Sequence, residues 1–213
     1  MMWWFMGQKS GASALSLQRN FGIGSYRTAW AILQKLRSCM LRRELSQLTG
    51  DVEVDEIFVG GLKNKEPIAV AAEVRGLGTG RIRLRHIEGR TAAQIQNFIT
   101  ESIAPGSKII SDRHKSYVTI VEKGYSHDPK RKAYFWENLD RDDDRLLPRV
   151  HRVASLVKRW YYGTYHGRVD KDSLQKYLDE FVFRFNRRTS GSRGLVFHRL
   201  IQVALTPNSE RLA

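Results

Sequence analysis

The chain is poor in cysteine and has no long uninterrupted apolar run. Cys39 is the only cysteine among 213 residues, which excludes an internal disulfide and a zinc site built from cysteines. It follows an apolar helical pattern, so we expect an inert thiol buried in the core. Residues 1–6 are apolar but too short to span a bilayer, and they lack the basic leader of a signal peptide. We therefore expect a cytoplasmic protein without a membrane partner, and we interpret residues 1–6 as the tail of a buried element whose upstream part is missing.

Acidic side chains are scarce relative to basic ones. The chain has 22 Asp and Glu residues against 36 Lys and Arg residues, which gives a net charge of +14. This excess predicts a polyanionic partner, most simply nucleic acid; a basic protein that merely tolerates its charge is the alternative. An apolar content of 41% is ordinary for a globular chain and excludes general disorder. The length suits one main domain with small additions.

The first part of the chain predicts two helices separated by a glycine turn. Residues 13–20 form the first helix, Gly22 and Gly24 end it, and Ser25 caps the second. This is the outline of a helix-turn-helix that reads DNA, but a helical hairpin that only packs has the same outline. Both interpretations stay open. The apolar face predicted for the second helix contains Tyr26, Ala29, Trp30, Leu33, Leu36 and Met40.

After residue 50 the pattern changes to strands. Strands are predicted at 52–59, 68–74, 81–87 and 108–111, with Asp112 at the end of the last one and a short helix at 117–121. A helix that begins at Thr91 separates the third and fourth strands, and its inward residues are Ala92, Ile95, Phe98, Ile99 and Ile103. This order predicts an α/β fold with a mixed sheet. The first three strands form an antiparallel meander, and the fourth returns through the helix to lie beside the first. Residues 126–147 are mostly polar and are predicted to be irregular.

Three helices are predicted in the last part of the chain. The first begins at Pro148 and ends near Gly163. Asp172 or Ser173 caps the second, and the third covers about 194–205. The inward residues of the second helix are Leu174, Tyr177, Leu178, Phe181 and Phe185.

Two acids occupy strand positions where apolar residues are expected. Asp55 lies within an apolar strand, and Asp112 ends another. Buried carboxylates are costly unless they are paired or bound to metal. If the fourth strand lies beside the first, Asp55 and Asp112 can meet and hold Mg²⁺ or Mn²⁺. Two metals held in this way can activate a water or hydroxyl and stabilise the leaving oxygen of a phosphodiester. The alternative is that both acids form salt bridges with arginines at the surface.

The helix from Pro148 offers His151 as a third candidate ligand. Lys158 follows seven residues later, so the two share a helix face, and Arg152 and Arg159 form a second pair at the same spacing. A metal ligand beside a column of cations suits a site next to a DNA backbone, although an ordinary helical histidine is the alternative. The other candidate third ligands, none with a lysine at this helical spacing, are Glu56, Glu137, Asp140, Asp142, Asp143 and Asp144.

Taken together, the motifs resemble those of a known family. The resemblance rests on Val-Glu-Val-Asp-Glu at 52–56, Val-Gly-Gly at 59–61, Ser-Asp with a tyrosine at 111–117, Lys-Arg at 158–159, Gly-Thr-Tyr-His at 163–166, Tyr-Leu-Asp-Glu-Phe at 177–181 and Phe-Arg-Phe-Asn-Arg-Arg at 183–188. These segments resemble the bacterial insertion-sequence transposases of the DDE superfamily, in particular the group whose third catalytic residue varies among Glu, Asn and His. The resemblance covers about residues 15–200, nearly the whole chain.

The resemblance implies a fold, an activity and roles for residues. The fold would be ribonuclease H-like, with helical segment 1–49, catalytic domain 50–165 and C-terminal helices 166–213. The activity would be strand cleavage at transposon ends and strand transfer into target DNA. It would depend on Mg²⁺ or Mn²⁺ and would need no small-molecule cofactor. The protein would act as a multimer assembled on DNA in the nucleoid. The residues expected to act are Asp55, Asp112 and His151 as catalytic metal ligands, and Lys158, Arg159, Arg152, Arg187 and Arg188 as contacts to DNA.

Two departures from the family pattern leave alternatives open. Family members usually carry an upstream zinc-ribbon segment, and this chain begins after the place where it would lie. A truncated, non-catalytic DNA-binding remnant or regulator is therefore one alternative, and a nuclease of the same fold is another. The second departure is His151, because imidazole suits Mn²⁺ better than Mg²⁺. We expect an active protein to prefer Mn²⁺, or to use His151 to orient water or phosphate.

Overall fold

A computed structural model describes residues 1–40, 46–61, 65–112, 115–130, 147–167 and 169–205. The chain divides into two compact units, a sheet unit of Ser46–Lys158 and a helical unit that combines Met1–Leu45 with Arg159–Ala213. Both ends of the chain thus belong to the helical unit. The three consecutive domains expected from the sequence, with boundaries after residues 49 and 165, stay a prediction. Within the described residues, no helix is both long enough and apolar enough to cross a membrane.

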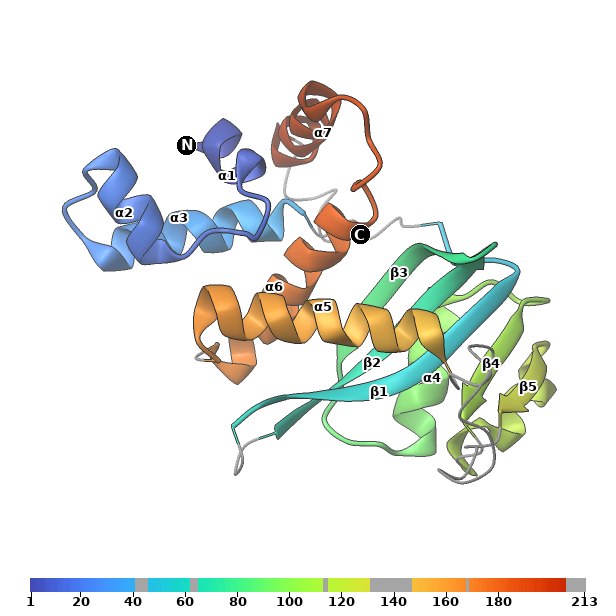
Figure 1. Ribbon diagram of the computed structural model, residues 1–213. Coiled ribbons are helices and arrows are strands. Elements are labelled where there is room, and N and C mark those ends of the chain that lie inside the picture. Colours follow the sequence, from blue (N-terminus) through green and yellow to red (C-terminus); the bar gives the residue numbers. More distant parts are fainter. Residues whose placement is uncertain (41–45, 62–64, 113–114, 131–146, 168, 206–213) are drawn as a thin grey trace, which may run out of the picture. The chain divides into compact units, whose positions relative to one another are not determined.

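The sheet unit contains a five-stranded mixed sheet, drawn in Figure 1. Its strands, in the order β3-β2-β1-β4-β5, are β1 (Asp51–Gly60), β2 (Lys65–Arg75), β3 (Gly78–His86), β4 (Lys108–Asp112) and β5 (Ser126–Lys130). The first three strands form an antiparallel meander, while β4 pairs in parallel with β1 and with β5. The predicted α/β class and the predicted place of the fourth strand beside the first are therefore confirmed.

The fifth strand corrects the prediction that residues 126–147 are irregular. Residues 126–130 pair in parallel with the whole of β4, from Lys108 opposite Ser126 to Asp112 opposite Lys130. The segment is polar and has no apolar alternation, because it lies at the sheet edge; an edge also tolerates Pro129, which has no N–H to donate. Its pairing is provided by β4 and not by its own pattern. Residues 131–146 of the same prediction lie outside the described residues.

Helices cover both faces of the sheet, as Figure 1 shows. One face carries α4 (Ala92–Ser102), whose N-cap Thr91 accepts a hydrogen bond from the backbone N–H of Gln94 at 3.3 Å. The opposite face carries the beginning of α5 (Pro148–Tyr165). Of the residues predicted to face inward on α4, only Ala92 is exposed, because it lies in the first turn, beyond the edge of the core.

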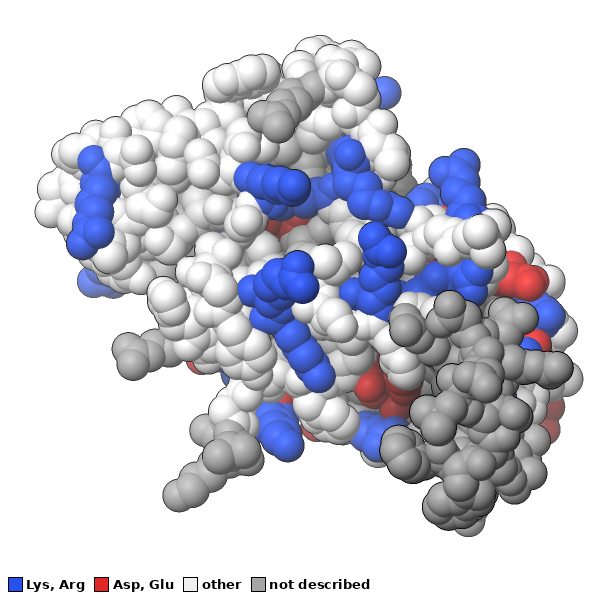
Figure 2. Space-filling model, in the orientation of Figure 1, with Lys and Arg blue, Asp and Glu red and all other residues white. Residues whose placement is uncertain are grey.

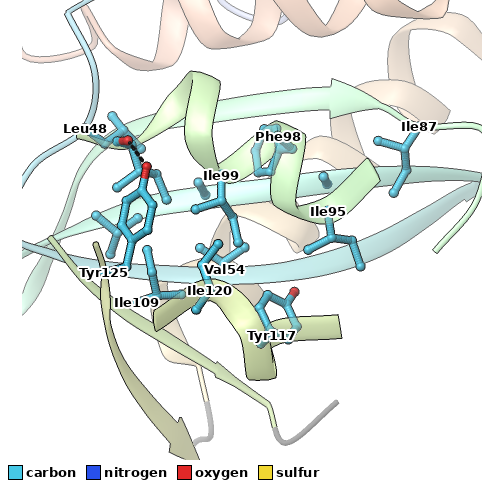
Figure 3. Close-up of a cluster of buried hydrophobic side chains, with 14 residues drawn as sticks. Leu48, Val54, Ile87, Ile95, Phe98, Ile99, Ile109, Tyr117, Ile120 and Tyr125 are labelled. Atoms are coloured by element: carbon cyan, nitrogen blue, oxygen red, sulfur yellow. Dashed lines mark hydrogen bonds between the residues drawn. The ribbon is translucent and has the colours of Figure 1, made fainter. Parts of the chain in front are cut away.

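The core beneath α4 is built from aliphatic and aromatic side chains (Figure 3). Phe98 and Ile99 of α4 pack over Val54 of β1, and all three are nearly inaccessible to solvent. The short 3-10 helix η1 (Lys115–Lys123), predicted at 117–121, adds Tyr117 to this core. At the other end of the cluster, the hydroxyl of Tyr125 donates to the carbonyl of Ile103 at 2.8 Å, so the buried polar group is satisfied.

The helical unit gathers the two ends of the chain. Its elements are α1 (Met2–Gly7), α2 (Ala14–Phe21), α3 (Tyr26–Ser38), the last turns of α5, α6 (Lys171–Phe185) and α7 (Arg193–Leu205). Ser13 caps α2 by accepting from the N–H of Ser16 at 3.1 Å, and Gly22 ends it in the left-handed conformation. Cys39 is buried as predicted, in a core that also contains Phe5 and Leu33.

Several helix details differ from the sequence-based expectation. Tyr26 and Trp30 of α3 are 55% and 39% exposed, because the core takes up only the narrower stripe of Ala29, Leu33, Leu36 and Met40. Ser25 precedes α3 without a side-chain capping bond. The helix α5 continues through Gly163 to Tyr165, since one glycine costs only about 1 kcal/mol inside a packed helix. The helix α6 starts at Lys171, earlier than predicted, after Asp170.

Candidate active site

Asp55 and Asp112 lie on neighbouring strands of the sheet. The parallel pairing of β1 with β4 runs from Asp51 opposite Lys108 to Glu53 opposite Ile110. Asp55 lies two residues beyond the last paired residue of β1, and Asp112 lies two residues beyond the last paired residue of β4. The pKa of the Asp55 carboxyl is raised, first because burial removes it from water and then because Glu56 and Asp112 place negative charge nearby. The negative charge of Asp112 therefore acts on Asp55, and the two predicted acids are close enough to interact electrostatically.

His151 lies beside the same pair. Its Nε2 atom is 3.9 Å from Oδ2 of Asp55, and the histidine side chain is 55% exposed while that of Asp55 is 21% exposed. His151 belongs to the first turn of α5, and its backbone carbonyl accepts a hydrogen bond from the Ser155 hydroxyl at 3.0 Å. The structure thus places the imidazole at the open side of a half-buried carboxylate, where it can reach solvent and a substrate.

Glu53 holds this helix on the sheet, and the sequence analysis did not single it out. One carboxylate oxygen accepts hydrogen bonds from the backbone N–H groups of Arg149 and Val150, at 2.8 and 2.9 Å. The other oxygen accepts from the Arg149 guanidinium at 2.9 Å. These N–H groups lie in the first turn of α5, where no helical carbonyl can reach them. Because Glu53 and Asp55 are two residues apart on one strand, they share a sheet face, and the anchor fixes His151 near Asp55.

A sequence signal for Glu53 exists at the start of α5. The residue before Pro148 is Leu147, whose side chain has no acceptor to cap a helix. A helix begun in this way needs an acceptor from elsewhere in the chain for its first N–H groups. Glu53 is 2% exposed, and a buried carboxylate is favourable only with such partners. The two observations together point to the contact.

Glu56 lies on the opposite face of the same strand. Its carboxylate accepts from the Tyr117 hydroxyl at 2.7 Å and from the Arg90 guanidinium at 2.7 and 3.0 Å. Burial first, and then the negative charge of Glu56, raise the pKa of Tyr117 far above its usual range, so the phenol stays protonated and donates. Glu56 is therefore tied into the core beneath α4. The remaining candidate third acids, Glu137 and those at 140–144, lie outside the described residues.

The basic residues predicted to contact DNA fall into two groups. Arg152, Lys158 and Arg159 are exposed along α5. Arg187 and Arg188 lie just after α6 in the helical unit, where each donates to a carbonyl of the last helical turn. Figure 2 shows separate Lys and Arg side chains on the drawn face, with fewer Asp and Glu side chains visible. This distribution suits a polyanionic partner.

The donor set fits a divalent cation by its chemistry. Asp55 and Asp112 supply carboxylate oxygens, and His151 supplies an imidazole nitrogen, a mixture that suits Mn²⁺ and allows Mg²⁺. Burial raises the pKa of Asp55 most, and the negative charges of Glu56 and Asp112 raise it further; a cation between these groups would relieve that repulsion. Across the part of the chain that the structure describes, no three His, Cys, Asp or Glu side chains are arranged tightly enough to hold a metal ion. The groups are neighbours, but not in a ligating arrangement.

Comparison with protein families identifies the chain. Residues 47–186, well over half of it, match the ISXO2-like transposase domain. The chain belongs to this transposase family. The matched segment of this transposase-family chain includes Asp55, Asp112 and His151, and it extends through α6. The five-stranded mixed sheet with strand order β3-β2-β1-β4-β5 and helices on both faces is the α/β core expected from the sequence.

One solved structure and the curated proteins complete the comparison. The chain is similar to a chain in the cryo-EM structure of the simian T-cell lymphotropic virus intasome in complex with PP2A regulatory subunit B56 gamma. The identity is 12%, the TM-score is 0.45, and the similarity covers 93% of this chain and 74% of that chain. The search of curated proteins gave no match.

Proposed function

We propose that this chain is a DNA transposase that cleaves strands at transposon ends and joins them to target DNA. The observation that carries the proposal is the position of Asp55 and Asp112 just beyond the paired residues of two neighbouring parallel strands, with His151 Nε2 at 3.9 Å from Asp55 Oδ2. Membership of the transposase family supports it independently. Hydrolysis of a phosphodiester at the transposon end releases a 3′-hydroxyl. This hydroxyl then displaces a 3′-oxygen of the target strand, so that one phosphodiester forms as another breaks.

The residues have separate tasks in this proposal. Asp55 and Asp112 would hold two divalent cations, Mg²⁺ or Mn²⁺, and His151 would complete or tune the site. Bound cations would supply activation of the attacking oxygen and neutralisation of the leaving oxygen. The exposed side chains of Arg152, Lys158 and Arg159 would contact phosphates of the DNA backbone, an interaction that weakens as salt rises. Arg187 and Arg188 are proposed as further contacts to DNA.

Assembly and location follow the same proposal. We propose that the chain acts as a multimer on DNA, because strand transfer joins two transposon ends to one target. Its place would be on the nucleoid in the bacterial cytoplasm. A net charge of +14 supports association with DNA, since phosphates attract a basic protein over several ångströms.

The direct test is a strand-transfer assay. The chain is incubated with labelled DNA from the ends of its own element and with target DNA, in Mg²⁺ or in Mn²⁺. Joined products support the transposase, nicks without joining support a nuclease, and a salt-sensitive shift without cleavage supports a DNA-binding remnant. The Asp55→Asn and Asp112→Asn variants should lose cleavage and joining but keep DNA binding.

A matched control uses the same strand. Asp51 also belongs to β1, but it is 49% exposed and faces Lys108 at 3.8 Å. The Asp51→Asn variant removes one carboxylate from the same strand without touching the proposed site, so it should cleave and join as the unchanged protein does. Equal activity of Asp55→Asn and Asp51→Asn would exclude a catalytic Asp55.

A further inference from the structure

The helical unit contains a basic cavity that no catalytic role uses. It has a volume of about 380 Å³ and is bounded by α1, the end of α6 and the start of α7. Among the lining residues that the structure describes, every charged one is a cation: Lys9, Arg184, Arg187 and Arg188. We propose that this basic cavity binds a phosphate of the DNA backbone. The inference rests on the proposed function for the identity of the polyanion.

Arg184 builds the wall of the basic cavity. Its Nε atom donates to the carboxylate of Glu180 at 2.9 Å, and Glu180 is fully buried. Its terminal N–H groups donate to the backbone carbonyls of Phe5 and Gln8 at 2.8 and 2.9 Å. These bonds fasten the N-terminal helix α1 to α6 and give the cavity a fixed shape. Because Glu180 offsets its charge, Arg184 is assigned to the structure of the cavity and not to anion binding.

Arg187 and Arg188 are held in place at the end of α6. Arg187 donates to the carbonyl of Phe183 at 3.1 Å, and Arg188 donates to that of Phe185 at 2.9 Å. Each guanidinium also stacks on the ring of the same phenylalanine, 3.9 Å from the ring centroid. A planar guanidinium fixed in this way matches a phosphate with two N–H groups and loses little side-chain entropy on binding.

The lining favours nucleic acid over a small free anion. Trp3 is 57% exposed at the same cavity, and its ring meets Phe197 edge-on at 5.2 Å between centroids. An exposed aromatic ring beside fixed cations offers a surface for a sugar or base next to the bound phosphate. The cavity therefore combines the two kinds of contact that a nucleotide in a strand requires. This use also explains why a large apolar ring stays exposed in α1.

The test measures how DNA binding depends on salt. Fluorescence anisotropy with a short labelled duplex gives the slope of log affinity against log salt for Lys9→Ala, Arg188→Ala and Lys176→Ala. Lys176 is an exposed lysine of α6 that does not line the cavity, and it serves as the matched control. If Lys9 and Arg188 contact phosphates, each of their variants lowers the slope by about 1, and Lys176→Ala leaves it unchanged.

Two further measurements keep the result decisive. Arg188→Ala also removes a capping bond of α6, whereas Lys9 lies outside that helix, so a slope change in Lys9→Ala cannot come from a frayed end of α6. Arg188→Lys keeps the charge but loses the paired donors, and its affinity should fall between those of the unchanged protein and Arg188→Ala. Addition of DNA should also quench the part of the tryptophan fluorescence that Trp3→Phe removes.

The outcomes separate this inference from the proposed function. Unchanged slopes for Lys9→Ala and Arg188→Ala, in a protein that still joins DNA strands, overturn the basic cavity and leave the transposase standing. Slopes that fall equally in Lys176→Ala also overturn it, because the effect then belongs to the overall charge. Reduced slopes in a protein without cleavage support the cavity and reject the catalytic proposal.

Discussion

Single side chains determine what the candidate active site can do. Asp55 accepts a hydrogen bond from the backbone N–H of Glu56 at 2.8 Å, which fixes its carboxylate, and burial raises its pKa. The exposed imidazole of His151 stands 3.9 Å away and is the softest donor at the site. A carboxylate pair alone would favour Mg²⁺, whereas an added imidazole shifts the preference toward Mn²⁺.

The metal preference should depend on His151. We expect the unchanged protein to form more joined product in Mn²⁺ than in Mg²⁺, and we expect His151→Ala to lose most of that difference. Quantified strand-transfer products in each metal measure it. His198→Ala, which removes an exposed histidine of α7, is the control and should keep the preference. If His151→Ala and the unchanged protein join strands equally in both metals, His151 has no part in the site.

Gly11 is a second residue whose identity is strongly restricted. Its φ angle is +79°, and a Cβ atom there would lie 2.7 Å from the Tyr165 hydroxyl oxygen. Gly22 has a similar φ of +61°, but among the described atoms nothing lies within 4 Å of the place that a Cβ atom would take. Both glycines therefore relieve backbone strain, and only Gly11 also makes room for a close contact.

The two glycines make a matched pair for a stability experiment. Gly22→Ala should lower the free energy of unfolding by about 1–2 kcal/mol, the cost of the left-handed conformation. Gly11→Ala should lose that amount and about 1–3 kcal/mol more, because the added methyl overpacks against Tyr165. Urea unfolding measures both variants. Equal losses would show that the contact near Tyr165 relaxes without cost.

Among the elements, α5 connects the sheet to the candidate active site. Arg149 in its first turn donates to the carbonyls of Gly76 and Gly78 at 2.6 and 3.3 Å, in addition to its contact with Glu53. The start of the helix is thus held by β1 and by the turn between β2 and β3. Because His151 follows Arg149 by two residues, its position relative to Asp55 depends on these bonds.

Loss of Glu53 should therefore affect both stability and activity. Glu53→Ala leaves two helix N–H groups without their acceptor and the Arg149 guanidinium without its carboxylate partner, and we expect a loss of about 3 kcal/mol in the free energy of unfolding. Strand transfer should fall even under conditions where the variant is fully folded by circular dichroism. Glu101→Ala is the control. The side chain of Glu101 is 59% exposed and pairs with Arg85, so its loss should lower the free energy of unfolding by at most about 1 kcal/mol. Normal strand transfer by folded Glu53→Ala would refute the anchoring role.

At the scale of the whole molecule, a buried ion pair connects the N-terminal and C-terminal segments that form the helical unit. Arg37 of α3 donates to Glu180 of α6 at 2.8 Å, and their side chains are 1% and 0% exposed. The Arg37 guanidinium also donates to the carbonyl of Ala12 at 3.1 Å and lies 3.8 Å from the ring centroid of Tyr177. Glu180 also accepts a hydrogen bond from Arg184, which in turn donates to the carbonyl of Phe5 in α1. The Glu180 carboxylate therefore connects α6 to α3 directly and to α1 through Arg184.

The helical unit should unfold readily without this carboxylate. Glu180→Ala leaves two arginines near or in the core without their anion, and we expect a loss of about 3–5 kcal/mol in the free energy of unfolding. Tryptophan fluorescence during urea unfolding reports mainly on this unit, because four of the five tryptophans, Trp3, Trp4, Trp30 and Trp160, belong to it. Asp172→Ala removes an exposed acid from the same helix and should cost less than about 1 kcal/mol. Losses of the same size in both variants would contradict the role of Glu180.

Local patterns were sufficient for most elements and for the choice of acids. Apolar runs predicted β1, β2 and β4, and apolar alternation predicted β3. Helical spacing predicted the buried faces of α4 and α6, because this period follows directly from backbone geometry. Asp55 and Asp112 stood out because acids are rare within apolar strands. Their use as metal ligands, with His151, stays a prediction.

Long-range contacts decided the rest. The strand β5 has no pattern of its own and exists because β4 offers an edge with which it can pair. Tyr26 and Trp30 lie outside the core because the neighbouring helices cover only part of the apolar face of α3. The sequence offers an uncapped helix start at Pro148, but the fold determines that Glu53, almost a hundred residues earlier in the chain, supplies the acceptor. Sequence periodicity predicts which residues are buried. The partner of a buried charge depends on the tertiary fold, because the packing determines which group lies within hydrogen-bonding distance.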